Sequence, residues 1–364
     1  MDKKLKIAVL TDSLVNRGGG EKEMITLAKY FDVDYYTGIY KPEETFSDFK
    51  KYKVKSLLSK KLPSLINTFY IRWKFKHMKF EKDYDAYIYF WPASLAAGHK
   101  TSPNIWYCNT PLRYLYDGRE DFLKGFKFYK RPLVKIAMWL IKSSDQKLVK
   151  NYLDKILVNS KNVEDRVTRY YDLKSEVVYP PVDVNKYKFK EFGDFYLSTG
   201  RLEQSKGVYL AVKAFQKMPE KKLVVLGGGM DEEYIKSLCK GYPNIKFVGA
   251  VEGKVLEDYY SRCLATIYLS RNEDFGMIPI ESMACGKPCI AVNEGGFKET
   301  IIHNKTGYLI DPNKITDADY VVNIIRQFEP KIKPMKKDCI EQASKFKEEN
   351  FIKGIKKAIE ECKK

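Results

Sequence analysis

The 364-residue sequence contains no uninterrupted apolar run that approaches the ~20 residues needed for a transmembrane helix. Its N-terminus passes directly into a short strand-like run, without the apolar region and small-residue cleavage site of a signal peptide. The three histidines lie far from one another and from any cysteine at ligand spacing, which argues against a zinc site. The seven cysteines form no C-x-x-C pair, as is typical of reduced thiols. These absences predict a cytoplasmic protein without a metal site.

Acidic residues are too few to balance the basic ones, since the sequence has 65 Lys and Arg but only 47 Asp and Glu, and the net charge is +18. This charge favours anionic partners but does not choose among nucleic acid, anionic lipid and phosphorylated substrates. Residues 50–80 contain ten Lys or Arg and no acid. Cations and apolar groups alternate there, as Phe69, Tyr70, Ile71, Trp73, Phe75 and Met78 among Arg72, Lys74, Lys76 and Lys79. The segment is either a solvated basic face or a docking element for the anionic inner face of the membrane.

Two α/β domains are expected from the length and from two strand-and-helix alternations. The sequence opens with a strand, a glycine loop, a helix over residues 21–31 with one apolar stripe, and a second strand. The predicted strands are residues 6–10, 34–36, 86–90, 104–107 and 155–158 in the first half, and 195–200, 223–226, 245–248, 265–269 and 289–292 in the second. The helix-like stretches between these strands can form the crossover connections that parallel strands require. The fold class is therefore α/β with two Rossmann-like βαβ domains.

The domain boundary is expected near Pro180-Pro181-Val182-Asp183, where prolines and a Lys-rich run interrupt the pattern. We predict an N-terminal domain over residues 1–183 and a C-terminal domain over residues 184–335. A last helix over residues 336–364 is expected to pack back across the domains.

A glycine run, Gly18-Gly19-Gly20, follows the first strand and precedes the first helix. Such a turn can bring main-chain N–H groups close to a phosphate or a sugar. The run matches neither G-x-x-x-x-G-K-[ST] nor G-x-G-x-x-G, and a glycine loop that only makes a turn is the commoner case.

Two cations follow the first strand of the second domain, Arg201 after Gly200 and Lys206 before Gly207. Both are expected at the carboxyl edge of the sheet, where open α/β folds bind ligands, beside a helix N-terminus. A diphosphate fits such a site, although exposed loop cations are more often only solvated.

The segment from Asn272 to Glu281 is the densest in candidate site residues. Glu273 is expected in a loop above the sheet edge and Glu281 within the following helix, with Gly276 and Pro279 between them. Carboxylates accept hydrogen bonds from hydroxyls and therefore suit sugar recognition. A helix-capping acid plus a surface glutamate explains the spacing equally well. Softer candidates follow another strand, where Lys254 and the turn over residues 249–251 could contact a base.

These strings resemble retaining glycosyltransferases of family 4, which have the GT-B fold. The resemblance spans most of the chain, through Gly19-Gly20-Glu21, residues 107–114, Ile156-Leu157-Val158-Asn159-Ser160, Tyr179-Pro180-Pro181-Val182-Asp183, Gly200-Arg201 with Lys206-Gly207, and Glu273 through Pro288. Several strings are most similar to a subgroup that contains O-antigen and related mannosyltransferases.

The resemblance implies a hexosyltransferase, with mannose favoured, that uses a nucleoside-diphosphate sugar and no metal or cofactor. It implies that Arg201 and Lys206 hold the donor diphosphate, Glu281 the ribose and Glu273 the transferred sugar, across a crevice between the domains. The implied donor-binding set is completed by Gly19, Gly20, Val248, Phe275, Gly276 and Met277. GDP-mannose is the favoured donor and a UDP-sugar is the alternative. The implied acceptor is a glycan or a lipid-linked saccharide.

The sequence departs from this family at Asn109, where the resemblance leads one to expect histidine. Asparagine forms hydrogen bonds but does not titrate near neutrality, so Asn109 is a catalytic candidate that cannot be a general base. This agrees with the same-face mechanism usually proposed for the family, in which the leaving phosphate oxygen takes the acceptor proton. The departure leaves open an altered donor, an altered acceptor or lost activity.

Two D-x-D strings, at residues 32–34 and 83–85, could indicate a manganese site, but both come before strands and are interpreted as loop acids. Three other functions stay open: a UDP-sugar-dependent hexosyltransferase, a sugar-nucleotide isomerase or silent binder of the same fold, and, remotely, a nucleic-acid-binding protein. Nucleic acid is not the expected partner.

Overall fold

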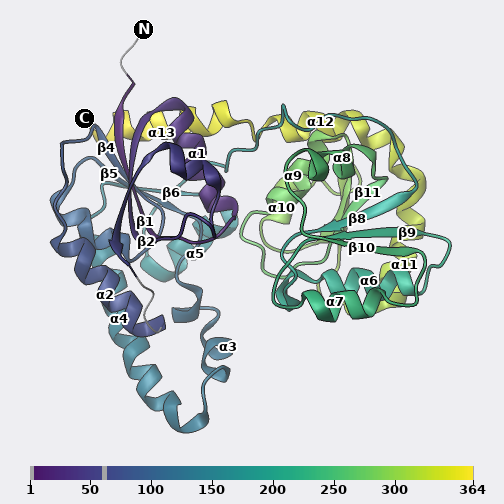
Figure 1. Ribbon diagram of the computed structural model, residues 1–364, viewed down its shortest axis with the longest axis horizontal. Helices are drawn as coiled ribbons and strands as arrows, with labels where there is room; N and C mark the ends of the chain where they lie inside the picture. Colours follow the sequence, from purple (N-terminus) through teal and green to yellow (C-terminus); the bar gives the residue numbers. More distant parts are fainter. Residues whose placement is uncertain (1–3, 60–63, 364) are drawn as a thin grey trace. The chain divides into compact units, whose positions relative to one another are not determined.

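The computed structural model describes residues 4–59 and 64–363, and the chain forms two compact α/β units (Figure 1). Unit 1 comprises Met1–Pro181 with Glu349–Lys364, and unit 2 comprises Val182–Glu348. The chain therefore leaves unit 1 within the proline-containing stretch that the sequence marks as a boundary, and it returns there for its last helix. Every named strand pair in both units is parallel, so the predicted α/β class is confirmed.

Unit 1 is built on a seven-stranded sheet of order β3-β2-β1-β4-β5-β6-β7. Its strands are β1 Lys6–Leu14, β2 Asp32–Tyr40, β3 Lys53–Leu58, β4 Ala86–Tyr89, β5 Asn104–Cys108, β6 Lys155–Val158 and β7 Glu176–Val177. The sequence did not predict β3, because this edge strand contains two lysines and all of its side chains are exposed or half-buried, so no continuous apolar run marks it. It also missed β7, which has only two residues.

Helices cover both faces of the unit 1 sheet. They are α1 Gly19–Tyr30, α2 Ser64–His77, α3 Arg119–Lys124, α4 Arg131–Asn151, α5 Lys161–Tyr171 and α13 Glu348–Cys362, with 3₁₀ turns η1 Ser47–Lys51, η2 Ser94–Lys100, η3 Arg113–Leu115 and η4 Phe128–Lys130. Alternate residues of each strand point to opposite faces. Ile7 and Val9 pack with α1 and α13, whereas Ala8 and Leu10 pack with α2, η2, α4 and α5.

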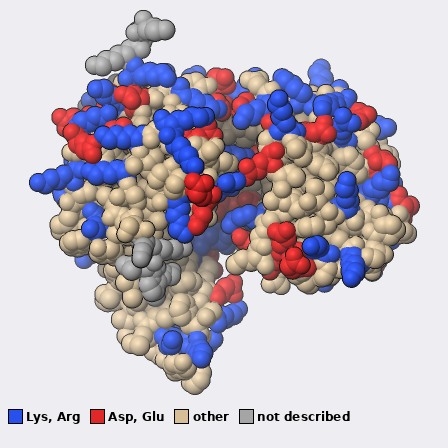
Figure 2. Space-filling model, viewed as in Figure 1, with Lys and Arg blue, Asp and Glu red and all other residues tan. Residues whose placement is uncertain are grey.

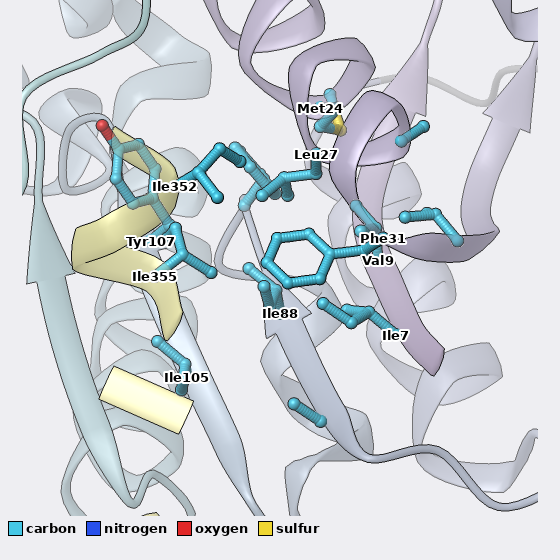
Figure 3. Close-up of a cluster of buried hydrophobic side chains, with 14 of the residues drawn as sticks. Ile7, Val9, Met24, Leu27, Phe31, Ile88, Ile105, Tyr107, Ile352 and Ile355 are labelled. Atoms are coloured by element: carbon cyan, nitrogen blue, oxygen red, sulfur yellow. The ribbon is translucent and has the colours of Figure 1, made fainter. Parts of the chain in front are cut away.

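The last helix of the chain completes the core of unit 1. Ile352 and Ile355 of α13 lie beside Tyr107 of β5 and near Ile88 of β4 (Figure 3). The rings of Tyr107 and Phe351 pack edge to face with their centroids 5.4 Å apart. Residues more than 300 positions apart in the sequence therefore share one hydrophobic core.

The single helix expected over residues 336–364 is two helices, α12 Lys336–Ser344 in unit 2 and α13 in unit 1. The break occurs because the buried Phe346 packs its ring 5.5 Å from that of Phe275. The carbonyl of Phe346 also accepts a hydrogen bond of 2.8 Å from the Val182 N–H. A continuous helix cannot make these contacts, since its carbonyls bond within the helix.

Unit 2 has a six-stranded sheet of order β10-β9-β8-β11-β12-β13. Its strands are β8 Phe195–Thr199, β9 Lys222–Leu226, β10 Ile245–Gly249, β11 Ala265–Tyr268, β12 Cys289–Val292 and β13 Gly307–Ile310. Its helices are α6 Val208–Gln216, α7 Glu232–Cys239, α8 Lys254–Arg262, α9 Met277–Ala284, α10 Phe297–Thr300, α11 Ala318–Phe328 and α12, with 3₁₀ turns η5 Gln204–Lys206, η6 Glu329–Lys331 and η7 Lys333–Met335. Helices α6, α7 and α11 pack on one side of the sheet, and α8, α9 and α12 pack on the other (Figure 1).

Substitution of Ile355 by Ala tests whether α13 is part of the unit 1 core. Ile355 is fully buried, so the substitution is expected to lower the free energy of unfolding of unit 1 by about 2–5 kcal/mol. All four tryptophans lie in unit 1, so tryptophan fluorescence during denaturation reports on that unit alone. Replacement of the exposed neighbour Lys356 by Ala is the control. Equal unfolding midpoints for the two variants would contradict the assignment.

Candidate active site

The carboxyl edge of the unit 2 sheet has one topological switch point, between β8 and β11. The strand order reverses there, because β9 and β10 lie on one side of β8 while β11, β12 and β13 lie on the other. In open parallel sheets the loops that flank such a point diverge and leave room for a ligand. These loops are residues 200–207, after β8, and residues 269–276, after β11. They contain five of the site residues predicted from the sequence: Arg201, Lys206, Glu273, Phe275 and Gly276.

An ion pair joins the two loops at this point. The Lys206 Nζ lies 2.8 Å from Oε2 of Glu273, and the two side chains are only 17% and 18% exposed. The Ser270 hydroxyl donates a 3.0 Å hydrogen bond to the same carboxylate oxygen. The structure therefore brings together two residues that lie 67 positions apart and were predicted to act on one donor.

The approach of the two loops requires glycine at position 207. Gly207 has φ +66, in the left-handed region, and caps the N-terminus of α6. A Cβ at this position would clash with the carbonyl oxygen of Leu269, at the start of the opposite loop. Any other residue would therefore be strained and would separate Lys206 from Glu273.

Arg201 lies in the same loop as Lys206 but extends into solvent. Its side chain is 68% exposed and its Nη1 lies 3.1 Å from Oε1 of Glu203. The preceding residue, Gly200, approaches the ring of Tyr268. Burial raises the pKa of the Tyr268 hydroxyl well above its usual value, the charge of Glu273 raises it further and that of Arg201 opposes the rise. Arg201 and Glu273 are thus close enough to act electrostatically on one group.

The main chain around Gly276 makes a sharp turn into α9. Gly276 has φ +86 and is the N-cap of that helix, so the first N–H groups of α9 follow it directly. The preceding Phe275 is buried against Phe346, which fixes the turn from the core side. The Gly296 N–H donates a 2.9 Å hydrogen bond to the carbonyl of Glu273, so the loop after β12 supports the turn as well.

Glu281 differs from the expectation of a carboxylate on an open cleft. It is 5% exposed, in the middle of α9, and its Oε2 accepts a 3.0 Å hydrogen bond from the buried hydroxyl of Tyr260. Glu273 and Glu281 were predicted to accept hydrogen bonds from the transferred sugar and the ribose of one donor, but only Glu273 belongs to the ion pair with Lys206. Removal of the Glu281 side chain would leave the Tyr260 hydroxyl without this acceptor, so it would also lower stability.

Val248 and Lys254 lie further from the switch point. Val248 is half-buried near the end of β10, and Lys254 is exposed at the start of α8. Strand β9 separates β10 from β8, so these residues are two strands away from the loop of Lys206.

Unit 1 holds the other predicted site residues, Gly19, Gly20 and Asn109. Gly19 and Gly20 form the first turn of α1, and a Cβ on Gly20 would lie 3.2 Å from Nδ2 of Asn109. The glycine run and the loop after β5 therefore meet. Asn109 is anchored from the other side by Asn159, whose Nδ2 donates to its carbonyl at 3.0 Å and to its Oδ1 at 3.2 Å.

Glu23, which was not predicted as a site residue, lies directly beside Asn109. The Asn109 Nδ2 donates a 2.6 Å hydrogen bond to Oε2 of Glu23, and the Glu23 side chain is buried. Burial raises the pKa of Glu23 to about 8, the Asn109 hydrogen bond opposes the rise, and the charge of Glu21 adds to it. The available signal was a glutamate one position before the buried Met24, where α1 faces the protein interior.

Asp12 is a second carboxyl that was not predicted as a site residue, and it is half-buried. It lies in β1 next to the switch point of unit 1, between β1 and β4, and its oxygens accept hydrogen bonds from the N–H groups of Ala93 and Ser94 at 3.2 and 2.8 Å. Burial raises the pKa of Asp12 to about 6, although the two hydrogen bonds act to lower it. Asp12 lines a cavity of about 140 Å³ together with Lys41 and Asn67.

The first D-x-D string lies in the sheet of unit 1, whereas the second comes just before β4, as predicted. Asp32 to Asp34 begin β2 and do not precede it, and the Oδ2 of Asp34 accepts a 2.6 Å hydrogen bond from Tyr84 and lies 3.0 Å from Nζ of Lys82. Asp85 accepts a hydrogen bond from the Lys6 N–H at 2.7 Å. Within the described ranges, no group of three or more His, Cys, Asp or Glu side chains is arranged to hold a metal ion.

Comparisons with known proteins find similar sequences and a similar fold. Residues 182–346 match the family of glycosyl transferases group 1. The chain is 26% identical to the alpha-1,3/1,6-mannosyltransferase alg-2 of Neurospora crassa, over 72% of this chain and 66% of that protein. It is also 26% identical to the alpha-1,3/1,6-mannosyltransferase ALG2 of Homo sapiens, over 63% of this chain and 60% of that protein. The chain thus spans less than two thirds of the length of these relatives.

The solved structure of HepE from Anabaena in complex with UDP is similar over almost the whole chain. Its TM-score is 0.75 at 17% identity, and the match covers 98% of this chain and 100% of that one. At this identity the likeness shows the fold alone. The protein has the GT-B fold of glycosyltransferases. Its C-terminal unit matches the glycosyl transferases group 1 family, in agreement with the resemblance to family 4.

Replacement of Glu23 by Gln tests the buried carboxyl beside Asn109. The pKa of Glu23 is raised from 4.5 to about 8 in the folded protein, so its stabilising contribution is complete below pH 4.5 and is lost as the pH rises through about 8. Glutamine keeps an acceptor for Asn109 and stays neutral. Glu23→Gln is therefore expected to match the stability of the wild type near pH 4.5 and to be more stable than the wild type above pH 8. The difference in free energy of unfolding is expected to be about 1.4 kcal/mol for each unit by which the pKa of Glu23 differs between the folded and unfolded states.

The measurement is denaturation followed by tryptophan fluorescence, across pH, for the wild type, Glu23→Gln and the exposed control Glu120→Gln. A stability difference for Glu23→Gln that does not change with pH would rule out the raised pKa.

Proposed function

We propose that the protein is a retaining, metal-independent glycosyltransferase that moves a mannosyl unit from a nucleoside-diphosphate sugar to a glycan or lipid-linked saccharide. The relatives named as alpha-1,3/1,6-mannosyltransferases support the sugar, and the match of unit 2 to glycosyl transferases group 1 supports the reaction class. The observation that carries the proposal is the Lys206–Glu273 ion pair at the switch point of unit 2.

This pair supplies the two kinds of group that a sugar diphosphate needs. The ammonium of Lys206 suits phosphate oxygens, and the carboxylate of Glu273 accepts hydrogen bonds from sugar hydroxyls. A diphosphate that takes Lys206 as its counter-ion competes with Glu273 for it. Once displaced, the Glu273 carboxylate turns to the hydroxyls of the bound sugar, while Ser270, 3.0 Å away, keeps one of its oxygens oriented.

The leaving diphosphate needs most of the electrostatic stabilisation. Negative charge grows on it as its bond to the anomeric carbon breaks, and groups that are already oriented stabilise that charge at the least cost. Lys206 and Arg201 provide two cations from the loop after β8. The N–H groups at the start of α9, after Gly276, add the positive end of a helix dipole.

The acceptor proton is proposed to pass to the leaving phosphate oxygen. Asn109 does not titrate near neutrality, so its contribution is a hydrogen bond from an amide that Glu23 and Asn159 hold in place. In this scheme no side chain of the protein acts as the general base.

The nucleotide is proposed to be GDP, by resemblance to mannosyltransferases, and UDP is the alternative. HepE, which has the same fold, was solved with UDP and with UDP-glucose. Glu281 is proposed to bind the ribose through α9, with its orientation set by Tyr260. A nucleotide-sugar isomerase would release an epimerised sugar without any acceptor, whereas a transferase would not.

Within the basic segment over residues 50–80, only α2 is proposed to contact an anionic membrane. Lys53 and Lys55 of β3 are paired with Glu81, and Arg72 is buried against Asp145. Lys60 and Lys61 lie outside the described residues. Helix α2 still exposes Phe69, Tyr70 and Trp73, and Lys74 lies over the rings of Tyr70 and Trp73. No helix in the described part of the chain is long and apolar enough to cross a membrane.

Substitution of Glu273 by Gln tests the role of the carboxylate. Gln retains the size of the side chain but loses the charge, so transfer from GDP-mannose is expected to fall about 100-fold or more in kcat. Binding of the nucleoside diphosphate should be kept or strengthened, because Lys206 loses its competing partner. The measurement is steady-state transfer to a lipid-linked saccharide, with calorimetry of GDP and UDP.

The control is Glu233→Gln, since the Glu233 side chain is 88% exposed on α7. Wild-type turnover in Glu273→Gln would exclude the assigned role. Transfer from UDP-sugars alone would keep the site and correct the donor.

A further inference from the structure

Helix α4 has two apolar stripes on opposite sides. Its buried stripe consists of Val134, Met138, Ile141 and Val149, together with Asp145, at helical spacing. A second stripe, made by Leu133, Ile136 and Leu140 with Trp139 beside it, faces away from the protein. A helix on the surface of a globular protein needs only one such stripe to reach its core. The second stripe therefore has no role in the packing of unit 1.

The exposed stripe continues into the turn before the helix. Six large apolar side chains between residues 128 and 140 are 46% to 80% exposed: Phe128, Tyr129, Leu133, Ile136, Trp139 and Leu140. Scattered exposed apolar residues need no explanation, but a contiguous group of this size marks a binding surface. We call η4 with the first half of α4, residues 127–140, the apolar tip.

The apolar tip is held firmly on the rest of unit 1. Leu115, Leu123, Val134, Met138 and Ile141 form a small core of their own between α4, α3 and η3. Figure 1 shows α3 and the N-terminal half of α4 projecting together from the sheet of unit 1.

Further along, α4 is anchored to α2 and α5 through Asp145. The Oδ1 of Asp145 lies 3.2 Å from Nη2 of Arg72, and its Oδ2 accepts a 2.7 Å hydrogen bond from Tyr171. The exposed side chains are thus carried by an ordered element, with their direction fixed.

Only basic residues accompany the apolar side chains on the tip. Lys127, Lys130, Arg131 and Lys135 lie within it, and residues 127–140 contain no acid. The single acid of α4 is Asp145, which is buried. In Figure 2 the projecting part of unit 1 is mostly tan, with a group of blue cations near its end.

We propose that the apolar tip inserts its side chains into the headgroup region of an anionic lipid bilayer. An amphipathic element with aromatic and aliphatic residues beside Lys and Arg has the composition of interfacial membrane anchors. Tyr129 and Trp139 each combine an apolar ring with a polar group, which suits the boundary between lipid tails and water.

Charge decides against two other occupants. A second copy of the chain on this face would bring the same four cations of both copies together, which destabilises a symmetric interface. A nucleic acid would match the charge, but Leu133, Ile136 and Leu140 offer it neither stacking nor hydrogen bonds.

The test uses the full chain and vesicles of phosphatidylcholine, with or without phosphatidylglycerol. The double variant Leu133→Asp/Ile136→Asp is expected to bind the anionic vesicles at least about tenfold more weakly than the wild type in co-sedimentation. Met230→Asp is the matched control, because Met230 is 90% exposed in unit 2. Trp139 is expected to shift its fluorescence to shorter wavelength on binding, and Trp139→Phe should remove most of that shift.

Several outcomes would overturn the proposal. They are unchanged vesicle binding by the double variant, equal loss in Met230→Asp, or a dimer in sedimentation velocity that the double variant dissolves. Loss of binding only when Trp73 of α2 is replaced would assign the membrane surface to α2 alone. The double variant should still bind nucleoside diphosphates at the wild-type level. A failure of the membrane proposal can therefore be distinguished from a failure of the proposed glycosyl transfer.

Discussion

Lys206 and Glu273 bind each other across the point where the strand order of unit 2 reverses, and the site is organised around that contact. The pair is mostly buried, so removal of either partner would leave a charge that water solvates poorly. The contact is possible because Gly207 lets the loop after β8 pass directly over the end of β11. A ligand that is anionic at one end and rich in hydroxyls at the other satisfies both partners.

Glu273 and Glu281 have different environments for a physical reason. Glu273 precedes the turn at Gly276 and lies in a loop, whereas Glu281 lies about one turn into α9 and accepts a hydrogen bond from Tyr260. Phe275 connects this turn to the core, because it packs against Phe346 at the break between α12 and α13. The segment that holds the site and the segment that carries the chain back to unit 1 are therefore coupled through one aromatic contact.

Much of the fold could be predicted from the sequence, because buried parallel strands such as β6 and β12 are short, continuous apolar runs. The edge strand β3 could not, since its lysines are held by Glu81 from outside the strand. Lys206 and Glu273 were predicted to share a site. The burial of Glu281 was not predicted, because it depends on a contact with Tyr260 that the spacing of the two glutamates does not show. Glu23 was missed because its partner Asn109 lies 86 positions away. Likewise, helical spacing alone does not show which stripe of α4 faces the solvent.

Lys206 is proposed to hold the diphosphate of a nucleotide sugar. Calorimetric titration of GDP, GMP, UDP and UMP into the wild type and Lys206→Met tests it most directly. For one base, the diphosphate should bind the wild type more tightly than the monophosphate, and Lys206→Met should lose that difference while it still binds the monophosphate. Equal affinities for diphosphate and monophosphate in the wild type, or a difference that survives in Lys206→Met, would contradict the account.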